Sequence, residues 1–267
     1  SYFSTKSEGI GGKKAVQWRL VDDVVPRVRW QEAIAERARD AAGSAARLPG
    51  GRGIELAELE KTRSDTAVSY AHVTALLDPE RGVAEITVPG PSADAPASMD
   101  DVYAQGAAFW PLAVARELDD LILDLRTNET EIGTWVFKTT GDPARVLAHD
   151  ELLLANYDRD WLAREIVLYW KRTLKRLDVT SRSLIALIEP GSAFAGSLLE
   201  LALAADRSYM LFGVFEDTGL PNTGLPNTGP DAAPAAITVG AANLGPLPMG
   251  NGLTRMQTRF LGDPDAL

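Results

Sequence analysis

The chain has 267 residues, 45% of them hydrophobic, which is enough for one large domain or for one domain with part of another. Lys and Arg total 27 against 37 Asp and Glu, so the formal net charge is −10. Such a charge repels a phosphate backbone, and we expect no nucleic-acid partner. The absence of cysteine excludes disulfides, thiolate nucleophiles and thiolate metal sites.

Membrane insertion and metal binding are also not expected. The longest apolar runs, such as residues 184–188, are too short to cross a bilayer, and the first residues lack the pattern of a signal peptide. We therefore expect a cytoplasmic protein without a membrane partner. His72 and His149 are too far apart to form a paired histidine metal motif, so the sequence predicts no metal site.

The first 47 residues are predicted to be largely helical. Helices are expected over residues 13–18 and 27–46, with Pro26 ending the short apolar run between them. Two helices of this size bury little by themselves and need a surface to dock on. Residues 48–64, which open with the breaker-rich sequence LPGGRG, are predicted to be a linker.

From residue 65 onward, predicted strands and helices alternate. The expected elements are a β-hairpin over 70–77 and 83–88, buried strands over 121–126, 134–137 and 184–188, and helices over 99–113, 116–120, 150–177 and 197–205. We expect the runs LILDLR (121–126) and LIALI (184–188) to be neighbouring strands. This alternation predicts an α/β layered domain with much parallel pairing.

Residues 218–230 contain a tandem GLPNT repeat, in which Pro and Gly recur every few residues. The LPNTG that occurs twice here resembles a sortase sorting signal, but no hydrophobic tail and basic end follow it. We predict an irregular, exposed loop without a catalytic role.

The stretch that points to chemistry is IEPGSAFAGSLLELALAADRSYM, residues 188–210. A buried strand leads into a turn of small residues, and the turn opens a helix that carries Glu200 in its first part and Asp206 near its end. Backbone N–H groups at such a helix start point outward along the positive end of the dipole. They can form an oxyanion hole that polarises a thioester carbonyl, although small residues before a helix also serve close packing.

This stretch resembles the signature of the crotonase (enoyl-CoA hydratase/isomerase) superfamily, and NLGPLPMGNGLTR (243–255) resembles a second segment of it. The sequence GKKAVQWRLVDDVVP (12–26) is similar to the helix that closes a crotonase domain. The resemblance implies a crotonase-like (ClpP/crotonase) α/β fold, a layered β-β-α superhelix. It further implies that residues 1–47 are the C-terminal helices of a preceding crotonase module, and that 65–267 form a second domain, incomplete at its C-terminus.

Within the superfamily, the stretches FWPLAVARELDDLILDLRTNETEIGTWVFKT (109–139) and SRSLIALIEPGSAFAG (181–196) resemble the benzoyl-CoA-dihydrodiol lyases. The resemblance implies a lyase that opens 2,3-epoxybenzoyl-CoA with water in aerobic benzoate degradation, giving formate and 3,4-dehydroadipyl-CoA semialdehyde. It implies no cofactor, since CoA is part of the substrate. The implied partners are the acyl-CoA substrate, the preceding crotonase module and further copies in a homo-oligomer.

Carried over residue by residue, the resemblance places Glu200 at the position of a catalytic glutamate. The residues implied to bind the thioester oxygen are Thr140, Gly141, Ala195, Gly196 and Ser197.

The sequence also departs from the pattern, since Ser197, Leu198 and Leu199 replace most of the usual glycines, and Ala241 stands where hydratases have a second acid. Three alternatives follow. The chain is part of the ring-cleaving enzyme and inactive alone, or a catalytically degenerate module with a structural or oligomerisation role, or an enoyl-CoA hydratase/isomerase-type enzyme for another acyl-CoA. In the degenerate reading, Glu200 is a structural helix-end carboxylate, as we expect Asp206 to be.

Overall fold

The computed structural model describes residues 6–44, 52–212 and 233–266, which form two compact units divided between Gly53 and Ile54. The N-terminal unit contains α1 (Gly12–Gln17), a 3-10 turn η2 (Arg27–Arg29) and α2 (Trp30–Gly43). Among the described residues of this unit, Ala15 is the one that is buried, and no residue of α2 is buried. The two helices predicted here are present, and they leave most of their apolar side chains exposed.

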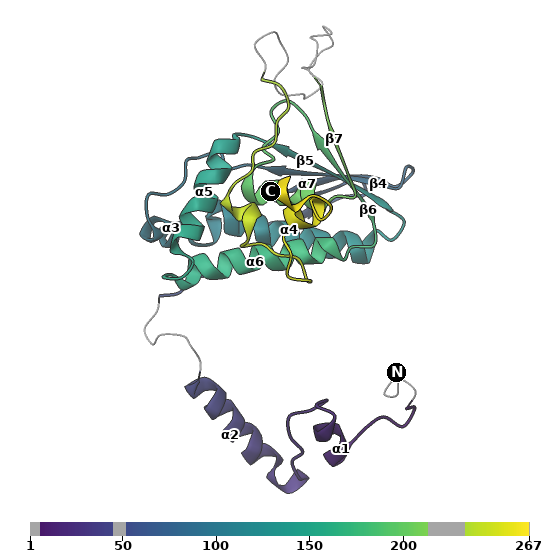
Figure 1. The fold of residues 1–267 in the computed structure, drawn as a ribbon, viewed down its shortest axis with the longest axis vertical. Helices are drawn as coiled ribbons and strands as arrows, with labels where there is room; N and C mark the ends of the chain where they lie inside the picture. The colour runs from purple at the N-terminus through teal and green to yellow at the C-terminus, as the bar shows by residue number, and fades with distance from the viewer. Residues whose placement is uncertain (1–5, 45–51, 213–232, 267) are drawn as a thin grey trace. The chain divides into compact units, whose positions relative to one another are not determined.

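The second unit is built on one seven-stranded sheet whose strands follow chain order (Figure 1). The strands are β1 (Thr62–Arg63), β2 (Ala67–Ser69), β3 (Thr74–Asp78), β4 (Val83–Pro89), β5 (Thr134–Thr140), β6 (Ser183–Ile188) and β7 (Arg207–Met210). Neighbours from β1 to β4 pair antiparallel, and those from β4 to β7 pair parallel. The predicted hairpin is present as β3 and β4, and the predicted α/β class with parallel pairing is confirmed.

Helices pack on the sheet and enclose the core (Figure 1). The helical segments are α3 (Met99–Gln105), η3 (Gly106–Ala108), α4 (Trp110–Asn128), α5 (Pro143–Asn156), α6 (Trp161–Asp178), α7 (Gly196–Ala204), η4 (Ala241–Leu244), α8 (Arg255–Arg259) and η5 (Pro264–Ala266). In β4, Ala84, Ile86 and Val88 are fully buried while the intervening side chains are partly exposed, so the core lies on one face of that strand. None of the helices in the described residues is long and apolar enough to span a membrane.

The prediction that LILDLR (121–126) is a strand beside β6 is wrong, because this segment lies inside α4. Leu118, Leu121, Ile122 and Leu125 are fully buried, whereas Leu123 is 41% exposed. A spacing of three and four residues between buried positions is that of a helix packed on one side. The strand that lies between β4 and β6 is β5.

Two of the predicted helix boundaries are also wrong. The helix expected over 150–177 is two helices, because Asp160 caps a new N-terminus by accepting bonds from the amides of Leu162 and Ala163. The helices expected over 99–113 and 116–120 instead divide at η3, and α4 runs without a break from Trp110. The loop predicted over 218–230 lies outside the described residues.

The parallel strands β5 and β6 are in register, with Phe137 opposite Ala186. Their carboxyl ends therefore meet at the same edge of the sheet, which is where ligand sites form in α/β proteins. The residues predicted to bind a thioester follow these two strand ends.

Candidate functional site

The first part of the site is the end of β5, which holds Thr140 and Gly141. The carbonyl of Thr140 accepts a hydrogen bond from the amide of Gly90 at 2.7 Å. Gly141 has φ +117, a left-handed conformation that L side chains rarely adopt. Its amide, one of the predicted oxyanion donors, is bonded to the carbonyl of Gly191 at 3.1 Å.

The second part is the turn into α7, which holds the other predicted donors. The amide of Ala195 donates to the carbonyl of Ala193 at 2.8 Å, and the amide of Gly196 donates to the carbonyl of Thr238 at 3.1 Å. Gly196 is the first residue of α7 and has φ +45. The structure thus places the helix start where the sequence predicted it, but these two amides already have backbone partners.

The amide of Ser197 is also occupied, by a side chain that the sequence analysis missed. It donates to Asp150 Oδ2 at 2.6 Å, and Asp150 lies in the middle of α5. The buried face of that helix consists of Val146, His149, Asp150 and Leu153. The sequence signal for Asp150 was therefore a single carboxylate at the spacing of a buried helical face. The pKa of Asp150 is raised to about 7, chiefly by burial; the hydrogen bonds of Ser197 oppose this rise, and the charges of Glu200 and Glu151 add to it.

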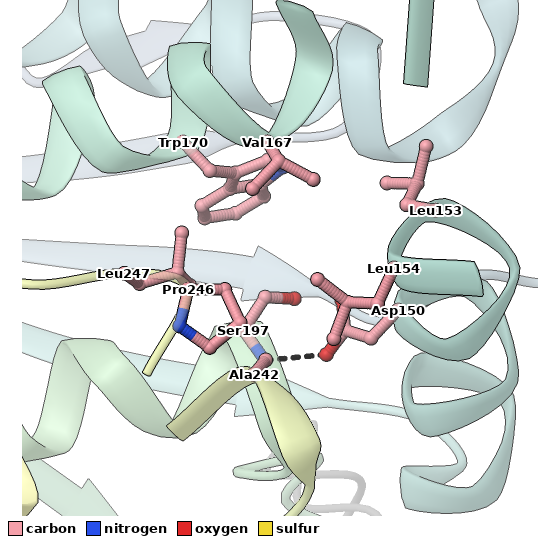
Figure 2. A pocket seen from close by; sticks show the side chains of 9 residues that line it. All are labelled: Asp150, Leu153, Leu154, Val167, Trp170, Ser197, Ala242, Pro246 and Leu247. Atoms are coloured by element: carbon pink, nitrogen blue, oxygen red, sulfur yellow. Dashed lines mark hydrogen bonds between the residues drawn. The ribbon is translucent and has the colours of Figure 1, made fainter. Parts of the chain in front are cut away.

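A small pocket lies around this contact (Figure 2). Its walls include Asp150, Leu154, Trp170, Ser197 and Leu247. The free volume of about 20 Å³ is enough for roughly one water molecule. A thioester group with its acyl chain does not fit in this space. Of the residues predicted to bind the thioester oxygen, Ser197 lines the pocket, and its amide is bonded to Asp150.

Glu200 is completely buried and both of its carboxylate oxygens are engaged. Oε1 accepts from the Asn243 side-chain amide at 2.7 Å, and Oε2 pairs with Arg255 Nη1 at 2.7 Å. Burial raises the pKa of Glu200, while Asn243 and Arg255 oppose that rise. Each oxygen therefore holds one hydrogen bond from the protein, and the fully buried side chain is not exposed to solvent.

Arg255 is the centre of this buried network, which we call the Glu200–Arg255–Asp178 network. Its Nε and Nη2 atoms bond the two oxygens of Asp178 at 2.9 and 2.7 Å. Its Nη1 atom also donates to the carbonyl of Leu247 at 3.1 Å. The network therefore joins α7, the end of α6 and the start of α8.

Asn243 makes a parallel connection between the 240–255 segment and α7. Its side-chain amide also donates to the carbonyl of Gly196 at 2.9 Å, and its Oδ1 accepts from the amide of Gly240 at 2.9 Å. The signal for both Asn243 and Arg255 was the segment NLGPLPMGNGLTR, whose resemblance was noted without a role for either residue. Ala241, at the position of the second acid, is exposed at the start of η4.

Asp206, just after the end of α7, accepts a hydrogen bond from the amide of Leu184 at 2.8 Å. This contact links the end of the helix to the start of β6, as expected for a structural carboxylate. Among the described residues there is no group of three or more His, Asp or Glu side chains that could hold a metal ion.

The close approach at the start of α7 gives a stability prediction for Gly196. A Cβ atom at this position would meet Asp150 Oδ2 at 2.1 Å, and φ +45 is itself unfavourable for alanine. We expect Gly196→Ala to lower the free energy of unfolding by about 2–4 kcal/mol, through backbone strain and loss of the Ser197–Asp150 bond. Urea denaturation measures this effect. Gly133→Ala, where a Cβ meets nothing within 4 Å, is the control, and equal losses in both variants would contradict the prediction.

The candidate site thus lies in an α/β domain, where parallel strands end in a glycine-containing turn and a buried helix that carries a glutamate begins. The chain is 45% identical over 260 residues to benzoyl-CoA-dihydrodiol lyase of Aromatoleum evansii, and the match covers 97% of this chain. The resemblance to that lyase predicted from the sequence is confirmed. The chain spans 43% of the length of this relative. No family model matches the chain.

Solved structures of enoyl-CoA hydratases are also similar to the chain. An enoyl-CoA hydratase/isomerase from Marinobacter aquaeolei has 14% identity and a TM-score of 0.35, covering 51% of this chain and 47% of that one. An enoyl-CoA hydratase from Bacillus halodurans has 15% identity and a TM-score of 0.34, covering 52% and 49%.

Proposed function

We propose that this chain is part of a crotonase-superfamily lyase that acts on a CoA thioester. The support is the 45% identity to benzoyl-CoA-dihydrodiol lyase over nearly the whole chain. The specific reaction that we propose is the opening of 2,3-epoxybenzoyl-CoA by water, with release of formate and 3,4-dehydroadipyl-CoA semialdehyde. No metal or redox cofactor is proposed, since the CoA thioester is the substrate.

Within that enzyme, we propose that residues 54–267 are a structural, catalytically degenerate crotonase module. The observation that carries this proposal is the occupation of the site by the protein itself. Asp150 accepts a hydrogen bond from the Ser197 amide, which would otherwise be available to an oxyanion. The Glu200 carboxylate accepts hydrogen bonds from Asn243 and Arg255. A general base must reach the proton that it removes, and an oxyanion donor must be free to meet the developing charge. The occupied Ser197 amide and the bonded Glu200 carboxylate support the degenerate-module proposal.

The substrate assignment is tested by incubating the complete protein that carries this sequence with 2,3-epoxybenzoyl-CoA and measuring formate. We expect formate and the semialdehyde CoA ester from the complete protein and neither from the 267-residue chain alone. Hydration of crotonyl-CoA in place of formate release would instead support an enoyl-CoA hydratase-type enzyme. Formate production by the chain alone would contradict the degenerate-module proposal.

The role of Glu200 is tested by Glu200→Gln in the complete protein. Loss of a general base lowers the rate on the order of 10²- to 10⁴-fold, whereas a structural carboxylate acts mainly on stability. We expect kcat to change by less than about threefold and the melting temperature to fall. Asp178→Asn, which removes the other carboxylate of the Glu200–Arg255–Asp178 network, is the matched control and should give the same pattern. A hundredfold loss of kcat confined to Glu200→Gln would make this module catalytic.

A further inference from the structure

Residues 54–63, part of the stretch expected to be a linker, belong to the second unit but bury no side chain. Ile54 and Leu59 are partly buried against the core, and the other residues of the segment are exposed. The segment ends in β1, which pairs with β2 through only two residue pairs. Arg116 of α4 also donates to the carbonyl of Ala57 at 2.6 Å. Because so little apolar surface is buried, hydrophobic contacts hold this segment, which we call the strap, only weakly.

Two cations at the end of the strap meet carboxylates of α4 and of its C-terminal cap. Lys61 pairs with Asp120 at 2.9 Å and also with Asp124, whereas Arg63 pairs with Asp124 and Glu129. Asp124 is the centre of this cluster, since its side chain is 4% exposed and each of its oxygens contacts one cation. Burial acts to raise the pKa of Asp124, but the surrounding hydrogen bonds and charges, led by the Lys61 ammonium, lower it overall.

The strap supplies the positive charge that this side of α4 requires. Asp120 and Asp124 are one helical turn apart, a spacing at which like charges repel. Both cations that pair with Asp124 come from the strap. The side chains of Lys61 and Arg63 are 29% and 34% exposed, so dissolved ions can reach them. The attachment of the strap is therefore mainly electrostatic, and salt weakens electrostatic contacts at partly exposed sites.

We propose that the strap is a salt-sensitive ionic latch, which detaches from α4 as one segment and thereby sets the reach of the chain between the two units. With the latch closed, the chain is attached to the second unit from Ile54 onward. With the latch open, the first element that the sheet holds is β2, which begins at Ala67. The stretch released by opening, residues 54–66, can extend to at most about 45 Å. The proposal does not rest on the lyase activity or on the role of Glu200.

Hydrogen exchange of the unmodified 267-residue chain at 50 mM and 1 M NaCl tests the latch. We expect the amides of residues 62–64 to exchange about tenfold faster at 1 M, where the Debye length falls to about 3 Å. The Ser64 amide, which donates to the carbonyl of Ala67 at 2.8 Å, is the main reporter. The amides of β4 and β5 should keep their rates. An unchanged Ser64 rate, or an equal acceleration in β4, overturns the proposal.

Arg63→Met tests the same contacts without added salt. The variant loses the pairs with Asp124 and Glu129 and keeps an apolar side chain of similar length. At 50 mM NaCl we expect the amides of residues 62–64 to exchange about tenfold faster than in the unmodified chain, with little further response to salt. Arg81→Met, at an exposed surface pair, is the matched control and should leave these rates unchanged. If both variants behave alike, the strap is not held by its charges.

Detachment of the whole strap is tested by a nitroxide label near its middle. The chain has no cysteine, so Glu58→Cys at an exposed position provides a single attachment point. We expect the label to become more mobile when NaCl is raised from 50 mM to 1 M. A label at Asp158→Cys, exposed just after α5, is the control and should not respond. A strap label that is as immobile at 1 M as at 50 mM overturns the detachment.

Discussion

Replacing Arg255 by methionine will lower the free energy of unfolding by about 3–5 kcal/mol, because the change removes the one cation from a buried network with two carboxylates. Arg255 and Glu200 each have side chains only 1% exposed, and the third member, Asp178, is 16% exposed. Met fills a similar volume, so the loss will come mainly from the unpaired charges. The methionine variant and the unmodified chain are compared by urea denaturation at pH 7.

The matched control is Arg81→Met, at a surface pair in which the arginine side chain is 83% exposed and 3.6 Å from Asp78. Exposed ion pairs contribute about 0–1 kcal/mol, so this variant should change stability little. The triple variant Arg255→Met, Glu200→Gln, Asp178→Asn should recover part of the loss, since neutral partners leave no buried charge uncompensated. A triple variant less stable than Arg255→Met alone would show that the loss does not arise from unpaired charge.

The sequence predicted the sheet better than it predicted the helix boundaries. The hairpin of β3 and β4 and the strands β5 and β6 follow from turn residues and from short apolar runs that are typical of buried strands. The segment LILDLR was assigned wrongly because four of its six residues are apolar, and so short a run fits both the strand period and the helix period. Reading the pattern from Trp110 onward, with Leu118 included, shows the helical spacing that the structure has.

The candidate site was located by sequence, but its state could not be predicted that way. The glycine turn and Glu200 lie at the predicted helix start, because the backbone there requires Gly196. The partners that bond to these groups are distant in the sequence. Asn243 and Arg255 lie 43 and 55 residues from Glu200, and Asp150 lies 47 residues from Ser197. Nothing in the local pattern of α5 shows which amide Asp150 meets. A carboxylate inside an apolar helical face is nevertheless a signal that some buried partner exists.

The same carboxylate gives the second large effect, on the pH dependence of stability. Burial raises the pKa of Asp150 from 3.8 to about 7, so the folded chain holds this proton more tightly than the unfolded chain does. The proton therefore stabilises the folded state at low pH. That contribution is lost progressively as the pH rises from about 4 to about 7, and is absent above the folded pKa. A shift of this size corresponds to at most about 4 kcal/mol.

Asp150→Asn removes the charge and keeps an oxygen that can accept the Ser197 amide bond. We expect the variant to equal the unmodified chain in stability near pH 4 and to exceed it increasingly up to pH 7, with a plateau of several kcal/mol at pH 8. Urea denaturation of both proteins at pH 4, 5, 6, 7 and 8 measures the difference in the free energy of unfolding. The contributions of the other carboxylates, Glu200 included, largely cancel in this difference. Asp158→Asn, at an exposed position just after α5, is the control and should change stability by no more than about 0.5 kcal/mol at any pH. If Asp150→Asn were instead less stable than the unmodified chain at pH 8, the carboxylate would be a net stabilising group, held by contacts stronger than its burial cost.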